Sequence, residues 1–292
     1  MQSFAEENII TDTADMLGQL EEFFHANRRV LVLSGAGIST ASGIPDYRGR
    51  DGVRRGNTPV QGPEFRKHVA VRKRYWARSM IGYATMAGAL PNAAHRALAS
   101  LQAAGRIAPL LTQNVDGLHQ RAGSTDVLEL HGSIHQVVCL DCQRLFSRAQ
   151  VQAMLVERNP HHIGVAALAA PDGDAHVDAD DLERFDVAPC PDCGGTLKPD
   201  VVFFGDGVPA ATTIEAVRRV DAADALLVVG SSLMVFSGFR FCRMAAAAGK
   251  PIAAINLGIT RADELLDLKL DASAEQLLPQ LAAALTQAFP TH

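Results

Sequence analysis

The stretch RVLVLSGAGIST, residues 29–40, joins a short run of β-branched and leucine residues directly to two glycines. Such a run predicts a buried strand of a parallel sheet. A G-x-G turn at its carboxyl end lets backbone N–H groups and the start of a helix face a phosphate. The dehydrogenase fingerprint is incomplete, because Thr40 occupies its third glycine position and no acidic residue ends a second strand about 20 residues on. We therefore predict a nucleotide-binding turn that holds its nucleotide differently from a hydride-transfer cofactor.

Apolar runs of strand length alternate with helical patterns along the rest of the chain. This alternation predicts an α/β fold with a doubly wound, Rossmann-like parallel sheet. Residues 46–90, helical from 65 to 80, and residues 138–197 break the alternation, and we interpret both as insertions that form a smaller lobe. The apolar runs are 107–112, 127–130, 201–204, 225–230 and 252–257, and the helical patterns are 12–26, 93–104, 210–222 and 236–248.

Composition and charge narrow the class of protein. The chain has 292 residues, of which 48% are hydrophobic and 20% are charged, and its net charge is −5. These values are ordinary for a globular protein and indicate neither a nucleic-acid nor a membrane partner. Acidic residues precede the first basic residue, Arg28, which is the opposite of a transit peptide. No apolar run reaches the roughly 18–20 residues of a membrane span. We expect a cytoplasmic protein.

Four of the five cysteines form two C-x-x-C pairs, CLDC and CPDCGG. Paired cysteines in a reducing compartment are more often metal ligands than disulfides, and four thiolates are the ligand set of a tetrahedral structural zinc. Such a site keeps no open position, so we expect it to perform no chemistry. Free thiols or a redox pair are the alternatives, and the fifth cysteine, Cys242, is expected to be packed and inert. The predicted ligands are Cys139, Cys142, Cys190 and Cys193.

Polar or glycine residues follow several of the apolar runs. In an open α/β sheet, ligands bind outside the carboxyl ends of the strands, so these residues predict a dinucleotide that lies along one edge of the sheet. They are Gln113, Asn114 and Asp116 after the run 107–112, His131 after 127–130, Gly230, Ser231 and Ser232 at the end of the run 225–230, and Asn256 with Gly258 at the end of the run 252–257.

His131 is the best candidate for a general base. It follows a predicted strand, and Gly132 leaves backbone room beside it. Neutral imidazole accepts a proton near physiological pH. His119, which lies close to the polar cluster in sequence, is expected to be structural instead.

Taken together and in this order, the motifs resemble those of sirtuins, the NAD-dependent protein deacylases. The resemblance covers about residues 28–280, and it rests on GAGIST with GIPDYRG, TQNVDGLH, LHG, the two cysteine pairs, LKPDVVFFGD, GSSL and INLG. PDYRG, RKRYWAR at 72–78, PDGD and VVFFGD resemble the class II branch, which includes a member associated with lipoamidase and ADP-ribosyltransferase activities. GSSL departs from the commoner GTSL by a conservative change of hydroxyl residue.

The resemblance implies two lobes with a cleft between them. It implies a Rossmann-like NAD-binding domain made of residues 1–46, 91–137 and 198–292. Residues 47–90 would form a cofactor loop and helical module, and residues 138–197 a zinc-binding module with four cysteine ligands. Val201 and Val202 resemble the segment that clamps a substrate peptide through backbone pairing.

The resemblance also implies a mechanism in which NAD is a consumed co-substrate. The carbonyl oxygen of an acylated lysine attacks C1′ of the nicotinamide ribose and displaces nicotinamide. A ribose hydroxyl then attacks the resulting imidate, and water releases lysine and O-acyl-ADP-ribose. By resemblance, His131 is the general base acting through the ribose hydroxyls, Asn114 positions the ribose and the water, Gln113 holds the ribose, and Asp116 recognises the nicotinamide carboxamide.

The remaining contacts to NAD are likewise implied by resemblance. The nicotinamide end and the mobile cofactor loop are lined by Ala36, Asp46, Tyr47 and Arg48. The phosphates are addressed by Gly35, Gly37, Thr40, Ser231 and Ser232, and the adenosine part by Asn256. Ala274 lies where family members contact adenine, so a contact there must use its backbone. The other residues expected to bind NAD are Ser39, Gly230, Leu257 and Gly258.

The resulting prediction is an enzyme that acts on acylated-lysine proteins, with longer acyl or lipoyl groups favoured over acetyl. The main alternative is mono-ADP-ribosyl transfer to proteins in the same pocket, which would leave the acyl group on lysine. A zinc-dependent dehydrogenase is disfavoured by the closed cysteine site, and a module that only binds is disfavoured by the set of Asn114, Asp116 and His131. The sequence does not indicate an oligomeric state.

Overall fold

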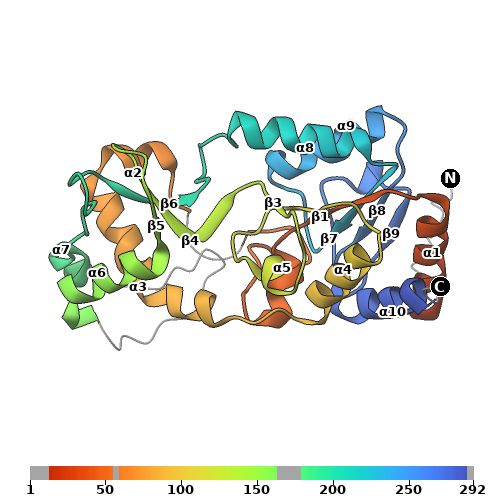
Figure 1. The fold of residues 1–292 in the computed structure, drawn as a ribbon, viewed down its shortest axis with the longest axis horizontal. Coiled ribbons are helices and arrows are strands. Elements are labelled where there is room, and N and C mark those ends of the chain that lie inside the picture. The colour runs from red at the N-terminus through yellow and green to blue at the C-terminus, as the bar shows by residue number, and fades with distance from the viewer. Residues whose placement is uncertain (1–12, 55–58, 163–178, 288–292) are drawn as a thin grey trace, which may run out of the picture.

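Six parallel strands form the sheet of the larger lobe in the computed structural model, which describes residues 13–54, 59–162 and 179–287. Their order is β3-β2-β1-β7-β8-β9, so the strand order reverses between β1 and β7 (Figure 1). In doubly wound sheets ligands bind outside the carboxyl ends of the strands at this reversal. The strands are β1 (Val30–Ser34), β2 (Leu111–Thr112), β3 (Leu128–Glu129), β7 (Ala225–Val229), β8 (Ile252–Ile255) and β9 (Leu268–Leu270).

Helices cover both faces of this sheet because its central strands are apolar on both sides. Successive side chains of a strand point to opposite faces, and in β1 Val30 and Val32 join one core cluster while Leu31 and Leu33 join another. The first cluster contains α1 (Thr13–Ala26), α4 (Ala93–Ala103) and α10 (Ala274–Gln287), and the second contains α8 (Ala210–Ala222) and α9 (Phe236–Ala247).

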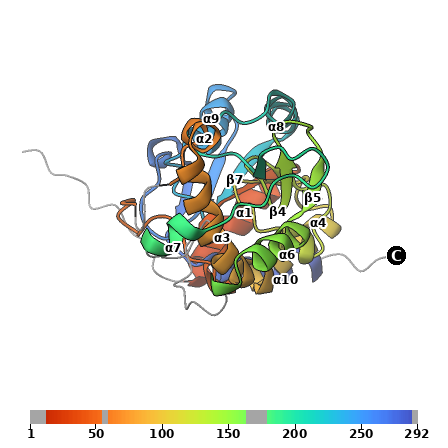
Figure 2. The ribbon, with the colours of Figure 1, turned by 90° about the vertical axis from the view of Figure 1, so that its left-hand side faces the viewer.

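The smaller lobe packs helices around a three-stranded antiparallel sheet (Figure 2). Its core is rich in aromatic residues, with the ring of Tyr75 within 5.6 Å of the rings of Phe65, Trp76 and Phe203. The strand order is β5-β4-β6, with β4 (Gly132–Cys139), β5 (Leu145–Ser147) and β6 (Leu197–Val201), and the helices are α2 (Gly62–Lys67), α3 (Val69–Gly88), α6 (Arg148–Arg158) and α7 (Ala179–Arg184). The short helices η1 (Ala36–Ser42), α5 (Leu118–Arg121), η2 (Pro160–His162) and η3 (Asp263–Leu265) lie in connections.

The α/β fold class and the smaller lobe are as expected, but one predicted strand is wrong. The run 201–204 does not join the parallel sheet: β6 ends at Val201 and pairs antiparallel with β4 in the smaller lobe. An apolar run shows that a segment is buried, but it does not show which sheet the segment joins. In addition, β2 and β3 cover only two residues each of the runs 107–112 and 127–130, and the helix after the glycine turn is the short 3₁₀ helix η1.

No helix among the described residues is both long and apolar enough to cross a membrane. The PDGD motif and the acidic residues before residue 13 lie outside the described residues.

Candidate active site

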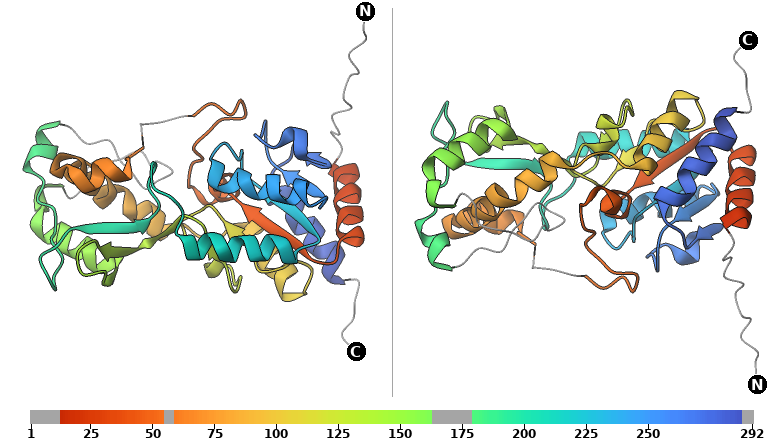
Figure 3. Two further views of the ribbon diagram at one scale, coloured as in Figure 1. Left: turned by 90° about the horizontal axis from the view of Figure 1, so that it is seen from above. Right: turned by 90° about the horizontal axis from the view of Figure 1, so that it is seen from below.

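The carboxyl end of β1 points toward the smaller lobe, where a glycine turn joins it to η1 (Figure 3). The N–H of Gly35 donates to the carbonyl oxygen of Val229 at 3.0 Å, and the N–H of Gly37 donates to that of Gly230 at 2.8 Å. A Cβ on Gly35 would lie 2.7 Å from Cβ of Ser231, and one on Gly37 would lie 2.9 Å from the oxygen of Gly230. The two strand ends can approach this closely only without these side chains. The two glycines thus allow the backbone of the turn to pack closely against the end of β7. The N–H groups of both glycines are hydrogen-bonded to carbonyl oxygens of the protein.

Asn114 and Asp116 lie in the loop after β2 and are fixed by a shared serine, Ser39. Nδ2 of Asn114 donates to Oγ of Ser39 at 3.1 Å and to the carbonyl oxygen of Gly35 at 3.2 Å. Oγ of Ser39 in turn donates to Oδ2 of Asp116 at 2.7 Å, and the N–H of Leu118 donates to Oδ1 at 2.9 Å. Both side chains are buried, at 8% and 4% exposure. Oδ1 of Asn114 accepts no hydrogen bond within the described part of the chain, so it is free to bind a ligand.

His131 is held at both ring nitrogens. Its Nδ1 lies 2.8 Å from the carbonyl oxygen of Gln113, and its Nε2 lies 2.7 Å from Oγ of Ser237. Burial lowers the pKa of His131 from its ordinary value of 6.5, and the guanidinium of Arg240 adds to the lowering. The imidazole is therefore neutral at physiological pH. Because a carbonyl only accepts, Nδ1 of the neutral ring carries the hydrogen, and the lone pair that can take a proton is on Nε2.

One cavity of about 500 Å³ brings most of the predicted residues together, and both lobes line it. Residues predicted to be catalytic and residues predicted to bind the cofactor line the same cavity. A single extended substrate could therefore contact both groups at once. The predicted residues that line it are Gly35, Ala36, Gly37, Ser39, Asp46, Tyr47, Arg48, Gln113, Asn114, Asp116, His131, Gly230, Ser231, Ser232, Asn256 and Leu257.

Three predicted cofactor-binding residues do not line the cavity. Oγ1 of Thr40 donates to the carbonyl oxygen of Gly37 on an exposed turn. Gly258 packs against the backbone of Arg50, where a Cβ would lie 2.1 Å from the carbonyl oxygen. Ala274 is the first residue of α10 and is buried in the core. Their roles in binding NAD remain predictions.

His119 occupies a buried network behind the cavity, in line with the structural role expected for it. Its Nε2 lies 2.7 Å from Oγ of Ser34, which donates to Oγ1 of Thr112 at 2.8 Å. The same Oγ1 accepts the N–H of Asn114 at 3.1 Å. Burial lowers the pKa of His119 to about 3, so the ring stays neutral. The network therefore supports the backbone at Asn114 without carrying charge on the histidine.

Sequence reasoning missed Ser237 and Arg240, which line the cavity from the first turns of α9. They lie in the apolar segment VFSGFRF, where a lone serine and a lone arginine give no signal of a site. The valine pair of the expected peptide clamp also lines the cavity, and the N–H of Val202 donates to the carbonyl oxygen of His131 at 2.8 Å.

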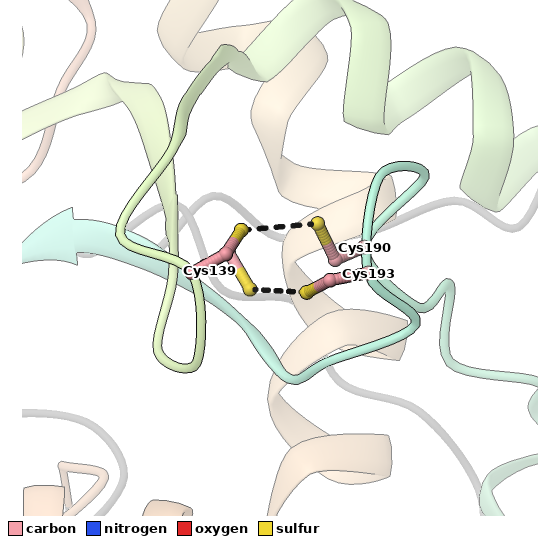
Figure 4. Close-up of side chains that lie close together, drawn as sticks. Cys139, Cys190 and Cys193 are labelled. Atoms are coloured by element: carbon pink, nitrogen blue, oxygen red, sulfur yellow. Dashed lines mark hydrogen bonds between the residues drawn. The ribbon is translucent and has the colours of Figure 1, made fainter.

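The four predicted zinc ligands converge in the smaller lobe, and Figure 4 labels three of them, Cys139, Cys190 and Cys193. Cys139 is the last residue of β4 and Cys142 follows in the turn to β5, whereas Cys190 and Cys193 lie in the loop before β6. Their sulfur atoms all lie within 4.8 Å of one another, with Cys139 and Cys193 at 3.6 Å and Cys142 and Cys190 at 3.8 Å. A tetrahedral zinc with bonds of about 2.3 Å requires sulfur atoms about 3.8 Å apart. The four cysteines therefore fit a structural zinc ion, and Cys242 lies apart from them, buried within α9.

A glycine turn at the carboxyl end of β1, where the strand order of the parallel sheet reverses, places the molecule among the Rossmann-like α/β proteins. Within this class, residues 35–237 match the model of the Sir2 family. The chain belongs to that family.

Bacterial relatives match the chain over nearly their whole length. A protein of Pseudomonas syringae pv. tomato named NAD-dependent protein deacetylase 3 is 52% identical over 274 residues, which is 94% of this chain and 97% of the relative. An NAD-dependent protein deacetylase of Xanthomonas axonopodis pv. citri is 52% identical over 264 residues, 90% of each chain. Among solved structures, a complex described as Sir2 with a p53 peptide and NAD⁺ matches with a TM-score of 0.73 and 29% identity, covering 93% of this chain and 99% of the other.

Proposed function

We propose that the protein is an NAD-dependent protein-lysine deacylase. It transfers the acyl group of an acylated lysine to ADP-ribose and releases nicotinamide and O-acyl-ADP-ribose. The observation that carries the proposal is His131, which is held at both ring nitrogens and lines the same cavity as Asn114 and Asp116. The names of the bacterial relatives support the same activity. Four cysteines as metal ligands also fit a reducing compartment, which supports a cytoplasmic location.

His131 acts as the base of the acyl-transfer step. NAD supplies the ribose whose anomeric carbon receives the acyl oxygen, and a hydroxyl of this ribose must lose its proton as it attacks the acyl carbon. Nε2 of His131 can accept that proton because Nδ1–H is committed to the carbonyl oxygen of Gln113. The same hydrogen bond fixes the plane of the ring, so the lone pair keeps its direction.

Asn114 and Asp116 act by orientation. Asn114 uses its amide nitrogen within the protein and keeps Oδ1 for a hydroxyl of the ribose or for the reaction water. Asp116 is bonded at both oxygens, yet a carboxylate has about four acceptor positions, so two remain for the N–H groups of the nicotinamide carboxamide. Groups fixed before the substrate arrives lose little freedom on binding, which favours catalysis.

The four-cysteine site does no chemistry in this proposal. A zinc ion held by Cys139, Cys142, Cys190 and Cys193 has no open position for substrate or water. Its contribution is to hold the smaller lobe, which supplies one wall of the cavity. We propose residues 138–197 as the zinc-binding module, 47–90 as the cofactor loop and helical module, and the remainder as the NAD-binding domain, with β4 and β6 running across the boundaries.

We propose further that acyl chains longer than acetyl, or lipoyl-lysine, are the better substrates. Apolar side chains of the smaller lobe, including Val60, Tyr75 and Phe203, line the same cavity as His131. Each methylene group buried against such a wall contributes about 0.8 kcal/mol. A panel of acetyl-, butyryl-, octanoyl- and lipoyl-lysine peptides compared by kcat/KM tests this preference. Acetyl-lysine as clearly the best substrate would overturn it and leave the deacylase assignment intact.

The deacylase assignment is tested by the products formed from NAD and an acylated peptide. We expect nicotinamide, deacylated peptide and O-acyl-ADP-ribose in equal amounts by mass spectrometry. A peptide or protein that gains ADP-ribose and keeps its acyl group would identify mono-ADP-ribosyl transfer as the activity instead. Absence of nicotinamide release with every acylated peptide would count against both.

The pH dependence of deacylation should report the lowered pKa of His131. The base works only when it is neutral, so the rate falls as the ring takes up a proton. Since burial lowers the pKa below 6.5, the acidic limb of kcat/KM should have its midpoint below pH 6.5. An acidic limb centred at or above pH 6.5 would show that this histidine is not the group that titrates.

A further inference from the structure

Ser237 is the side chain that contacts the nitrogen of His131 expected to accept a proton. Its Oγ lies 2.7 Å from Nε2 of His131, and both residues line the cavity. The serine is the second residue of α9, and the next residue is Gly238. A Cβ on Gly238 would lie 2.5 Å from Oε1 of Gln113, so the start of α9 packs tightly against the residue that holds the other nitrogen of His131. The serine is therefore fixed relative to the ring.

The direction of the hydrogen bond follows from the tautomer. Nδ1–H of His131 donates to a carbonyl oxygen, so Nε2 of the neutral ring has no hydrogen and can only accept. The hydroxyl of Ser237 must then be the donor, and its proton points at the lone pair of the base. A hydroxyl group has two lone pairs left, so Ser237 can accept a hydrogen bond from the cavity side while it donates to His131.

We propose that Ser237 relays the proton from the ribose hydroxyl to His131. The inference rests on the proposed function and names a further residue of that reaction. As the ribose oxygen attacks the acyl carbon, its proton passes to Oγ of Ser237, and the proton already on Oγ passes to Nε2. The ribose O–H bond and the serine O–H bond break, a new serine O–H bond and an N–H bond form, and the serine ends as a neutral hydroxyl. Only His131 gains charge.

The test measures two steps separately: displacement of nicotinamide, which needs no base, and attack of the ribose hydroxyl, which needs one. Displacement of nicotinamide by the acyl oxygen precedes the proton transfer, so exchange of labelled nicotinamide into NAD in the presence of acylated peptide reports the first step alone. Deacylation reports both steps. The variants are Ser237→Ala, which removes the relay, and Ser237→Thr, which keeps a hydroxyl. Arg243→Ala, at an exposed position of the same helix, is the control.

We expect Ser237→Ala to slow deacylation by about tenfold or more, with nicotinamide exchange within about twofold of the unaltered protein. Ser237→Thr should recover most of the lost deacylation rate, and Arg243→Ala should change neither rate. An alanine variant that deacylates at the normal rate would overturn the relay. So would an equal loss of both rates, because that is the signature of a distorted site, or a threonine variant as slow as the alanine variant. Absence of both reactions in the unaltered protein would instead refute the proposed function.

Discussion

Replacing His131 with alanine is expected to lower the rate of deacylation by a factor of about 10³, within the range that general bases contribute. Nicotinamide exchange should continue, because the acyl oxygen needs no base to displace nicotinamide. The loss exceeds the one expected for the serine relay because the alanine variant retains no group that can take the proton. Initial rates of both reactions, measured with the same acylated peptide, give the two quantities.

A histidine that lies outside the cavity provides the matched control. His25 is exposed at the end of α1, and His25→Ala should leave both rates unchanged. Thermal unfolding of the His131 variant should lie close to that of the unaltered protein, which excludes global misfolding as the cause. Deacylation by His131→Ala at more than about a tenth of the normal rate would contradict its assignment as the base.

Loss of the zinc ligands is expected to have the largest effect on stability. Cys139 and Cys190 are buried in the core cluster of the smaller lobe, and all four sulfur atoms lie within 4.8 Å of one another, so removing two ligands leaves an incomplete metal site inside this core. Structural zinc binds such sites with about 10–16 kcal/mol of apparent free energy, which is as large as the whole free energy of unfolding of a typical domain, about 5–15 kcal/mol. We therefore expect Cys139→Ser with Cys190→Ser to abolish zinc binding and to unfold the smaller lobe.

The zinc content of the purified protein measures the loss of metal binding, and protection of amides from hydrogen exchange measures the unfolding of the smaller lobe. The unaltered protein should contain one zinc ion per chain and show protected amides in β4 and β6. The double variant should contain none and lose that protection, while Cys242→Ala, which removes the thiol outside the cluster, should retain the metal. A metal-free double variant with unchanged protection in β4 and β6 would show that zinc does not hold this lobe.

The sequence contained enough information for the centre of the fold because its central strands are continuous apolar runs. β1, β7 and β8 are buried at every position, and each lies within the run expected for it. β9, which reads LKL, was not predicted, since three residues with a central lysine give no strand signal. The run 201–204 was misplaced because burial in the smaller lobe and burial in the large sheet leave the same apolar pattern.

Residues of the candidate site could be predicted where a polar residue directly follows an apolar run of strand length. Asn114, Asp116 and His131 have this signature, and the structure brings all three to one cavity. Ser237 has no such signature, because a serine at the start of a helix is an ordinary capping residue in sequence. Its importance arises from a contact between α9 and His131, which lies between β3 and β4 and is 106 positions away in sequence, and local pattern does not report such contacts.

The packing of the glycine turn shows a second limit of sequence reasoning. Gly35 and Gly37 lie in a turn whose backbone N–H groups were expected to face a phosphate, and the N–H groups of these two glycines donate instead to the carbonyl oxygens of Val229 and Gly230. Phosphate binding by the turn stays a prediction. A glycine motif indicates close approach of the backbone, and only the fold reveals whether the approaching group is a ligand or a neighbouring strand.

The most direct test of the account is a crystal structure of the protein with NAD and an acylated peptide bound. The account predicts that the anomeric carbon of the nicotinamide ribose lies beside Asn114, with the carboxamide at Asp116. A ribose hydroxyl should lie within hydrogen-bonding reach, about 3 Å, of Oγ of Ser237 or Nε2 of His131. A ribose bound elsewhere in the cavity, out of reach of both Asn114 and His131, would contradict the assignment of the site.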